Sequence, residues 1–160
     1  MKYFITLFFI IINFPVFSSV TLNGTYLICE KTPEYFVKEV DKINENYIFF
    51  FLKHNFYEQK KIIKIDKSNI VNYSFQLFNT GKYGFKEKTI LFNDSLKFRK
   101  KAYKRELDRN TMMLQSKYKK ILIFEHFCEV SDLSKFDNKH IEIINKLKKF
   151  WKNKYKDNKI

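Results

Sequence analysis

Two cysteines and three histidines are the residues of this chain with the most specific chemistry. The cysteines are Cys29 and Cys128, and two thiols can form a disulfide, a redox centre or part of a metal site. The chain has no C-x-x-C motif, and His126 beside Cys128 is not by itself a ligand set. The other histidines, His54 and His140, complete no H-E-x-x-H spacing. We therefore expect a structural disulfide between Cys29 and Cys128, with free thiols or a metal site as the alternatives.

Other catalytic chemistry has no signature in the sequence. No G-x-S-x-G motif is present, and Gly24, Gly81 and Gly84 do not form a phosphate-binding loop. The carboxylates form no recognisable acid–base pair. We therefore expect no catalytic residue, no metal and no cofactor, and a protein that is not an enzyme.

The chain is strongly basic, with a formal net charge of +14. Of its 31 basic residues only three are arginines, namely Arg99, Arg105 and Arg109. Proteins that recognise nucleic acids rely on arginine for bidentate contacts, so this composition argues against nucleic acid as a partner. The abundance of Lys, Asn and Phe is also typical of an AT-rich genome. The basic charge is thus either functional or a result of codon bias.

The N-terminus has the pattern of a secretory signal. Lys2 precedes an apolar run from Tyr3 to Ile12, and Ser18 offers a small residue for cleavage. An uncleaved anchor is the alternative, but the run is shorter than a membrane span, and Asn13 and Pro15 interrupt its continuation. We expect residues 1–18 to be a cleaved signal peptide. Residues 19–160 are then one exported domain, periplasmic or secreted and soluble after cleavage.

Alternating apolar and β-branched residues predict a sheet over about residues 21–130. The predicted strands are residues 21–30, 47–52, 61–65, 73–78, 88–92, 103–107, 112–114 and 120–129. Residues 79–84 contain Gly81 and Gly84 and are predicted to be a connector. The first and last strands each carry one cysteine. A disulfide between those strands fits a closed barrel or a continuous antiparallel sheet.

A helix over about residues 138–156, with Asn138 as its N-cap, is predicted by an apolar stripe at spacings of three and four. The stripe consists of Ile141, Ile144, Leu147, Trp151 and Tyr155. We expect it to pack on the sheet. The lysines on the opposite arc suggest contact with an anionic envelope surface. They are Lys146, Lys149 and Lys152.

Residues 103–114 resemble a strand–Arg-x-Thr–strand hairpin found in small exported proteins of AT-rich bacteria. Arg109 and Thr111 supply the Arg-x-Thr element, which Asp108 precedes. The resemblance implies no activity. We expect Asp108 and Thr111 to bond the turn backbone and Arg109 to lie over an aromatic ring.

Residues 22–26 resemble the Gly-x-Trp entry of lipocalin-like barrels. Gly24 occupies the glycine position, and Tyr26 stands where those barrels have tryptophan. The resemblance implies an eight-stranded barrel that carries one small ligand.

These patterns predict an α+β fold, a mainly antiparallel β-sheet or small β-barrel with a C-terminal amphipathic helix. The leading functional hypothesis is an exported, non-enzymatic binding or envelope-interaction module. The alternative is a lipocalin-like carrier of a small apolar ligand.

Overall fold

The computed structural model describes residues 22–67, 70–94 and 104–157. The predicted signal, residues 1–18, lies outside them. The elements are β1 (Thr25–Lys31), the 3₁₀ helix η1 (Val40–Asn46), β2 (Tyr47–Lys53), β3 (Phe56–Lys67), β4 (Ile70–Lys86), β5 (Thr89–Asp94), β6 (Lys104–Asp108), β7 (Met113–Tyr118), β8 (Ile121–Ser131) and α1 (Leu133–Asp157). Among the described residues, no helix has both the length and the apolar character needed to cross a membrane.

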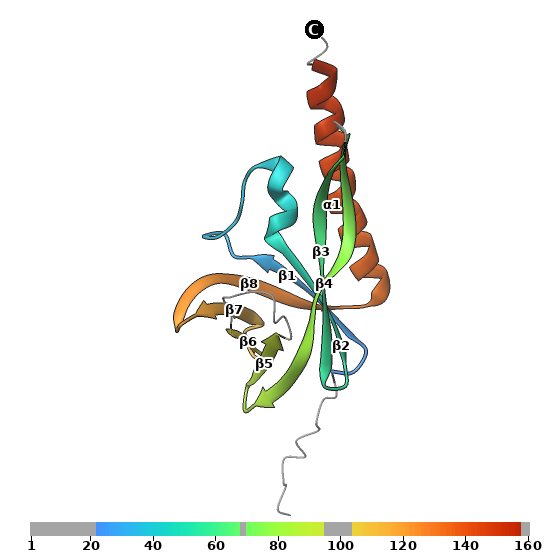
Figure 1. The fold of residues 1–160 in the computed structure, drawn as a ribbon. Coiled ribbons are helices and arrows are strands. Elements are labelled where there is room, and N and C mark those ends of the chain that lie inside the picture. The colour runs from blue at the N-terminus through green and yellow to red at the C-terminus, as the bar shows by residue number, and fades with distance from the viewer. Residues whose placement is uncertain (1–21, 68–69, 95–103, 158–160) are drawn as a thin grey trace, which may run out of the picture.

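The eight strands form a closed antiparallel barrel in simple meander order (Figure 1). Each strand pairs with the next along the chain, and β8 returns to pair with β1. Closure gives every strand two hydrogen-bonded neighbours, and residues 61–67 of β3 and 70–76 of β4 continue beyond the neighbouring strands as a two-stranded hairpin. The predicted α+β fold with a small barrel and a C-terminal helix is therefore confirmed.

The disulfide predicted between Cys29 and Cys128 is present and joins the first strand to the last. The two cysteines are directly opposite each other in the β1–β8 register, and both side chains are fully buried. The bond thus lies inside the barrel at the seam that closes it.

Side chains fill the barrel interior around the disulfide. Phe50 stacks on Phe92 with ring centroids 4.9 Å apart, and Tyr57 meets the Phe92 ring edge-on at 5.2 Å. Leu27, Leu52, Ile90, Leu107 and Leu114 complete this cluster, together with Ile48 and Tyr83. The alternate residues of β2, Tyr47 and Phe49, belong to a second cluster beneath α1. This explains why the apolar run of β2 is continuous, since both of its faces are buried.

The predicted connector at residues 79–84 is wrong, because these residues lie within β4. Gly81 occurs there for a packing reason rather than for a turn. A Cβ atom at Gly81 would collide with the backbone oxygen of Asn93 and with the Tyr57 ring. The absence of a side chain lets the Tyr57 ring pack against the β4 backbone.

The turn between β6 and β7 contains the side-chain-to-backbone hydrogen bonds and the cation–π contact that the sequence predicts. Asp108 Oδ1 accepts hydrogen bonds from the backbone N–H groups of Asn110, at 2.8 Å, and Thr111, at 3.0 Å. These bonds lower the pKa of the Asp108 carboxyl group. The Arg109 guanidinium carbon lies 5.6 Å from the centre of the Phe85 ring, which confirms the predicted cation–π contact.

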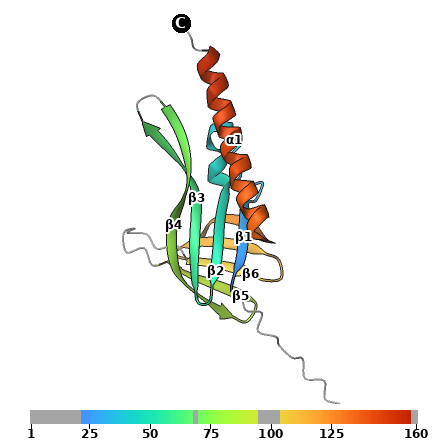
Figure 2. The same cartoon turned by 90° about the vertical axis from the view of Figure 1, so that its right-hand side faces the viewer.

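Helix α1 begins at Leu133, more than one turn before the predicted start at Asn138. Asp132 acts as the cap, because its Oδ1 accepts the backbone N–H of Lys135 at 2.7 Å. The helix runs along the outside of the barrel and beside the long β3–β4 hairpin (Figure 2). Phe136 is buried against the barrel wall, and Trp151 Nε1 donates to the Tyr73 hydroxyl at 2.7 Å.

Candidate functional site

A layer of polar side chains lies inside the barrel beside the apolar cluster. It consists of Gln59, Asn79, Arg105, Ser116 and His126, all of them buried. Strand alternation places them there, because a residue two positions from an inward-facing residue faces inward as well. Gln59 follows Tyr57 at this spacing, Ser116 follows Leu114, and His126 precedes Cys128. We call these five residues the polar layer.

Hydrogen bonds connect residues of the polar layer to side chains on other strands of the barrel. Arg105 Nη1 on β6 donates to Gln59 Oε1 on β3 at 2.6 Å. Asn79 Nδ2 donates to the Tyr57 hydroxyl at 3.2 Å. Since a guanidinium only donates, the Arg105 contact directs the amide nitrogen of Gln59 away from it.

Several buried polar atoms of this layer have no hydrogen-bond partner within the described part of the chain. They are Gln59 Nε2, Ser116 Oγ and both ring nitrogens of His126. A buried polar group without a hydrogen bond costs about 1–3 kcal/mol. The layer therefore offers hydrogen bonds that its described protein neighbours do not take up.

Positive charge surrounds the buried histidine. Burial, together with the charges of Lys31, Lys61 and Arg105, lowers the pKa of His126 to about 3. His126 is thus neutral at pH 7 and lies in a cationic environment.

A cavity of about 250 Å³ adjoins the polar layer at one end of the barrel, and His126 is part of its lining. Its other lining residues are Lys31, Asn44, Glu45, Tyr47, Ile48, Lys61, Ile62 and Phe124. They come from β1, η1, β2, β3 and β8. We call this space the mouth cavity. Lys31 is directly opposite His126 in the β1–β8 register.

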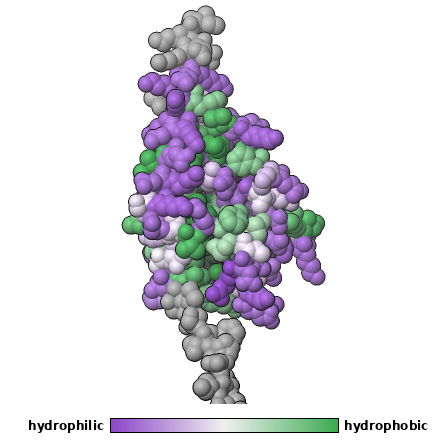
Figure 3. Space-filling model, turned by 180° about the vertical axis from the view of Figure 1, so that it is seen from behind, coloured by the Kyte–Doolittle hydropathy of each residue, from purple (hydrophilic) through white to green (hydrophobic). Residues whose placement is uncertain are grey.

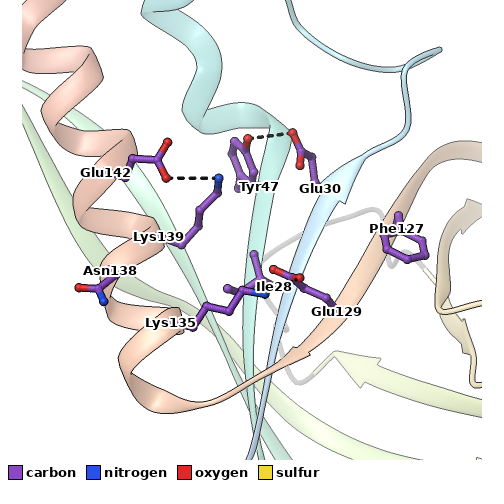
Figure 4. Close-up of a pocket in the computed structure, with 9 residues that line it drawn as sticks. All are labelled: Ile28, Glu30, Tyr47, Phe127, Glu129, Lys135, Asn138, Lys139 and Glu142. Carbon is purple, nitrogen blue, oxygen red and sulfur yellow. Dashed lines mark hydrogen bonds and ion pairs between the residues drawn. The ribbon is translucent and has the colours of Figure 1, made fainter.

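A larger groove of about 630 Å³ lies outside the barrel, between α1 and the paired strands β1 and β8 (Figure 4). Its polar groups bond to one another. The Tyr47 hydroxyl donates to Glu30 at 2.8 Å, and Lys135 pairs with Glu129 at 2.8 Å. Burial, followed by the bond to Glu30, raises the pKa of Tyr47. Because these groups bond to one another, the described residues of the groove have fewer buried polar atoms without a hydrogen bond than the polar layer has.

A second outer hollow of about 480 Å³ shares Glu30 and Phe127 with this groove. Pro33 and Phe36 give it an apolar lining, and Phe127 is 55 % exposed. Hydrophobic areas also appear among hydrophilic ones on the face seen in Figure 3.

The three lysines predicted to contact an anionic surface are all exposed on α1. Lys146 pairs with Glu142 at 2.8 Å, and this hydrogen bond lowers the pKa of Glu142. Lys149 and Lys152 lie farther along the helix. None of the three lines the mouth cavity. Their contact with an anionic envelope surface stays a prediction.

The sequence alone singles out His126 without indicating a partner for it, and it does not reveal Lys31, Gln59, Lys61 or Ser116 as members of the site. One signal was available. In the segment Tyr57-x-Gln59-x-Lys61, every second residue lies on the same face of the strand as Tyr57. Two of these positions carry polar residues where a purely structural strand would carry apolar ones. The segment Leu114-x-Ser116 follows the same pattern.

Within residues 22–67, 70–94 and 104–157, no group of three or more His, Cys, Asp or Glu side chains is placed to hold a metal ion. The chain matches no family model, no curated protein and no solved structure.

Proposed function

We propose that this chain is an exported, non-catalytic binding protein that holds a small polar ligand in the mouth of its barrel. The observation that carries the proposal is the polar layer, which holds buried polar atoms without hydrogen bonds to the described residues and reaches the mouth cavity at His126. Apolar side chains at these positions would avoid the cost of unsatisfied polar groups. A ligand that enters the mouth cavity, bonds to His126 and reaches the polar layer behind it would offset that cost.

The volume of the mouth cavity sets the scale of the ligand. At about 250 Å³, it is slightly smaller than the pockets that hold drug-sized molecules. A sugar, an amino acid or a small organic acid is of suitable size.

The interior packing favours a polar ligand over the apolar one that a lipocalin-like carrier would hold. Phe50, Tyr57 and Phe92 fill the barrel beside the disulfide. The adjoining mouth cavity has Lys31, Lys61 and His126 in its lining beside apolar side chains such as Ile48 and Ile62.

Export is part of the proposal. Its support is the signal pattern of residues 1–18 together with the buried disulfide, since structural disulfides persist in oxidising compartments. The proposal that the protein is not an enzyme rests on the missing catalytic motifs. It also rests on His126, since the charged groups that shift its pKa are cations.

The Ser116→Ala substitution tests the role of the polar layer. We expect it to raise the free energy of unfolding by about 1 kcal/mol, because a buried hydroxyl without a hydrogen bond is removed. We also expect it to weaken binding of the ligand by about 10-fold, which is the loss of one hydrogen bond. Binding would be measured by ligand-observed NMR against a set of sugars, amino acids, organic acids and inorganic phosphate.

Ser74→Ala on β4 is the matched control, since Ser74 is half-buried and belongs neither to the polar layer nor to the described lining of the mouth cavity. It should leave ligand binding unchanged. The proposal fails if no member of the set binds, or if Ser116→Ala destabilises the protein and leaves binding intact.

A further inference from the structure

We infer that the ligand of the barrel mouth is a small anion with a carboxylate or phosphate group, held by Lys31, Lys61 and His126 with the rest of the polar layer behind them. This inference rests on the proposed function and names the chemical class of its ligand. Neutral polar ligands are the alternative that the test below distinguishes.

Charge is the first argument. Three cationic side chains, those of Lys31, Lys61 and Arg105, lie close enough to His126 to lower its pKa. Arg105 is only 8 % exposed. Glu45 is the acidic residue among the described lining residues of the mouth cavity, and its side chain is exposed to solvent. Positive charge held in a partly dehydrated cavity attracts an anion more strongly than the same charge on an open surface.

Hydrogen-bonding capacity is the second argument. The Gln59 amide nitrogen is a donor, because the amide oxygen already accepts from Arg105. Ammonium and guanidinium groups only donate, and the Ser116 hydroxyl can donate as well. Lys31 and Lys61 in the cavity lining and Arg105, Gln59 and Ser116 in the polar layer behind His126 therefore present mainly donors. Carboxylate and phosphate oxygens are acceptors, and charged acceptors form the stronger bonds with such donors.

Aromatic contacts are the third argument, because they place the two lysines. The Lys31 ammonium lies 5.6 Å from the centre of the Phe124 ring, and the Lys61 ammonium lies 4.1 Å from that of Phe78. These contacts restrict side chains that would otherwise be mobile. Phe124 itself lines the cavity.

The test is thermal unfolding of the exported domain, residues 19–160, with inorganic phosphate, succinate or glucose at constant ionic strength. We expect a saturable stabilisation by phosphate, by succinate or by both, and none by glucose. A response to phosphate alone identifies a phosphoryl group as the recognised feature, and a response to succinate alone identifies a carboxylate. The double variant Lys31→Gln/Lys61→Gln should weaken the anion's apparent affinity by about 10-fold or more.

The matched control, Lys149→Gln/Lys152→Gln, removes the same charge from the exposed arc of α1. It should change the affinity less than about 2-fold, because salt screens distant surface charges. Equal losses in both double variants would indicate general surface electrostatics and overturn the inference.

The test also separates the two levels of the proposal. If glucose or another neutral compound binds in a manner sensitive to Ser116→Ala while neither anion does, the anion inference is wrong and the proposed function stands. If no compound shows binding sensitive to Ser116→Ala, both are wrong.

Discussion

Reduction of the Cys29–Cys128 disulfide will lower the free energy of unfolding by about 2–5 kcal/mol. The bond joins residues 99 positions apart, and a crosslink over so long a loop strongly restricts the unfolded chain. In the folded state it also fastens β8 to β1, the pair that closes the barrel. Urea unfolding with and without a reductant would measure the loss.

The double variant Cys29→Ala/Cys128→Ala provides the control. Its midpoint should not respond to reductant, and it should lie at or below that of the reduced protein, because it also loses buried sulfur atoms. If thiol titration shows complete reduction of the native protein and the urea midpoint does not move, the disulfide has no role in stability.

Acidification from pH 6.5 to about pH 4 will destabilise the native protein by roughly 3 kcal/mol through His126 alone. An unfolded histidine binds its proton near pH 6.5, whereas folding lowers the pKa of His126 to about 3. Between these values the unfolded state binds more protons than the folded state. Stability is therefore complete above pH 6.5 and is lost as the pH falls toward 3.

The comparison that isolates this effect is with His126→Gln, measured by urea unfolding across the same pH range in chloride salts. His140 also has a pKa lowered by burial, so the native protein and the variant share that part of the acid sensitivity. We expect the variant to have the shallower dependence on pH, and His54→Asn, at an exposed site, to follow the native protein. Parallel curves for native protein and His126→Gln would show that His126 is not buried in its neutral form.

Much of the fold was predictable because the strands alternate or are strongly apolar. Each of the eight predicted segments overlaps an observed strand. The cysteines indicated which strands meet, since Cys29 and Cys128 lie on the first and the last. The start of β3, residues 56–60, was missed because Gln59 is polar although it is buried inside the barrel. The glycines of β4 suggested a turn because the sequence does not show the Tyr57 ring that packs against Gly81.

The candidate site was much less predictable, because it depends on contacts between distant strands. Arg105 and Gln59 are 46 positions apart, and only closure of the barrel brings them within hydrogen-bond distance. His126 lies beside Cys128 in the sequence, but the charges that affect it come from β1, β3 and β6. No local motif encodes such an arrangement, since each strand contributes one or two residues.

The ¹⁵N spectrum of the His126 ring, recorded while phosphate, succinate or glucose is added, tests the central claim most directly. If the barrel mouth is a ligand site, at least one of these compounds will shift the ring nitrogens of His126 and the backbone amide of Ser116. Both shifts will saturate at the same concentration, while the exposed His54 ring stays unchanged. If His126 and Ser116 do not respond to any of the three compounds, the account of the barrel mouth as a binding site is contradicted.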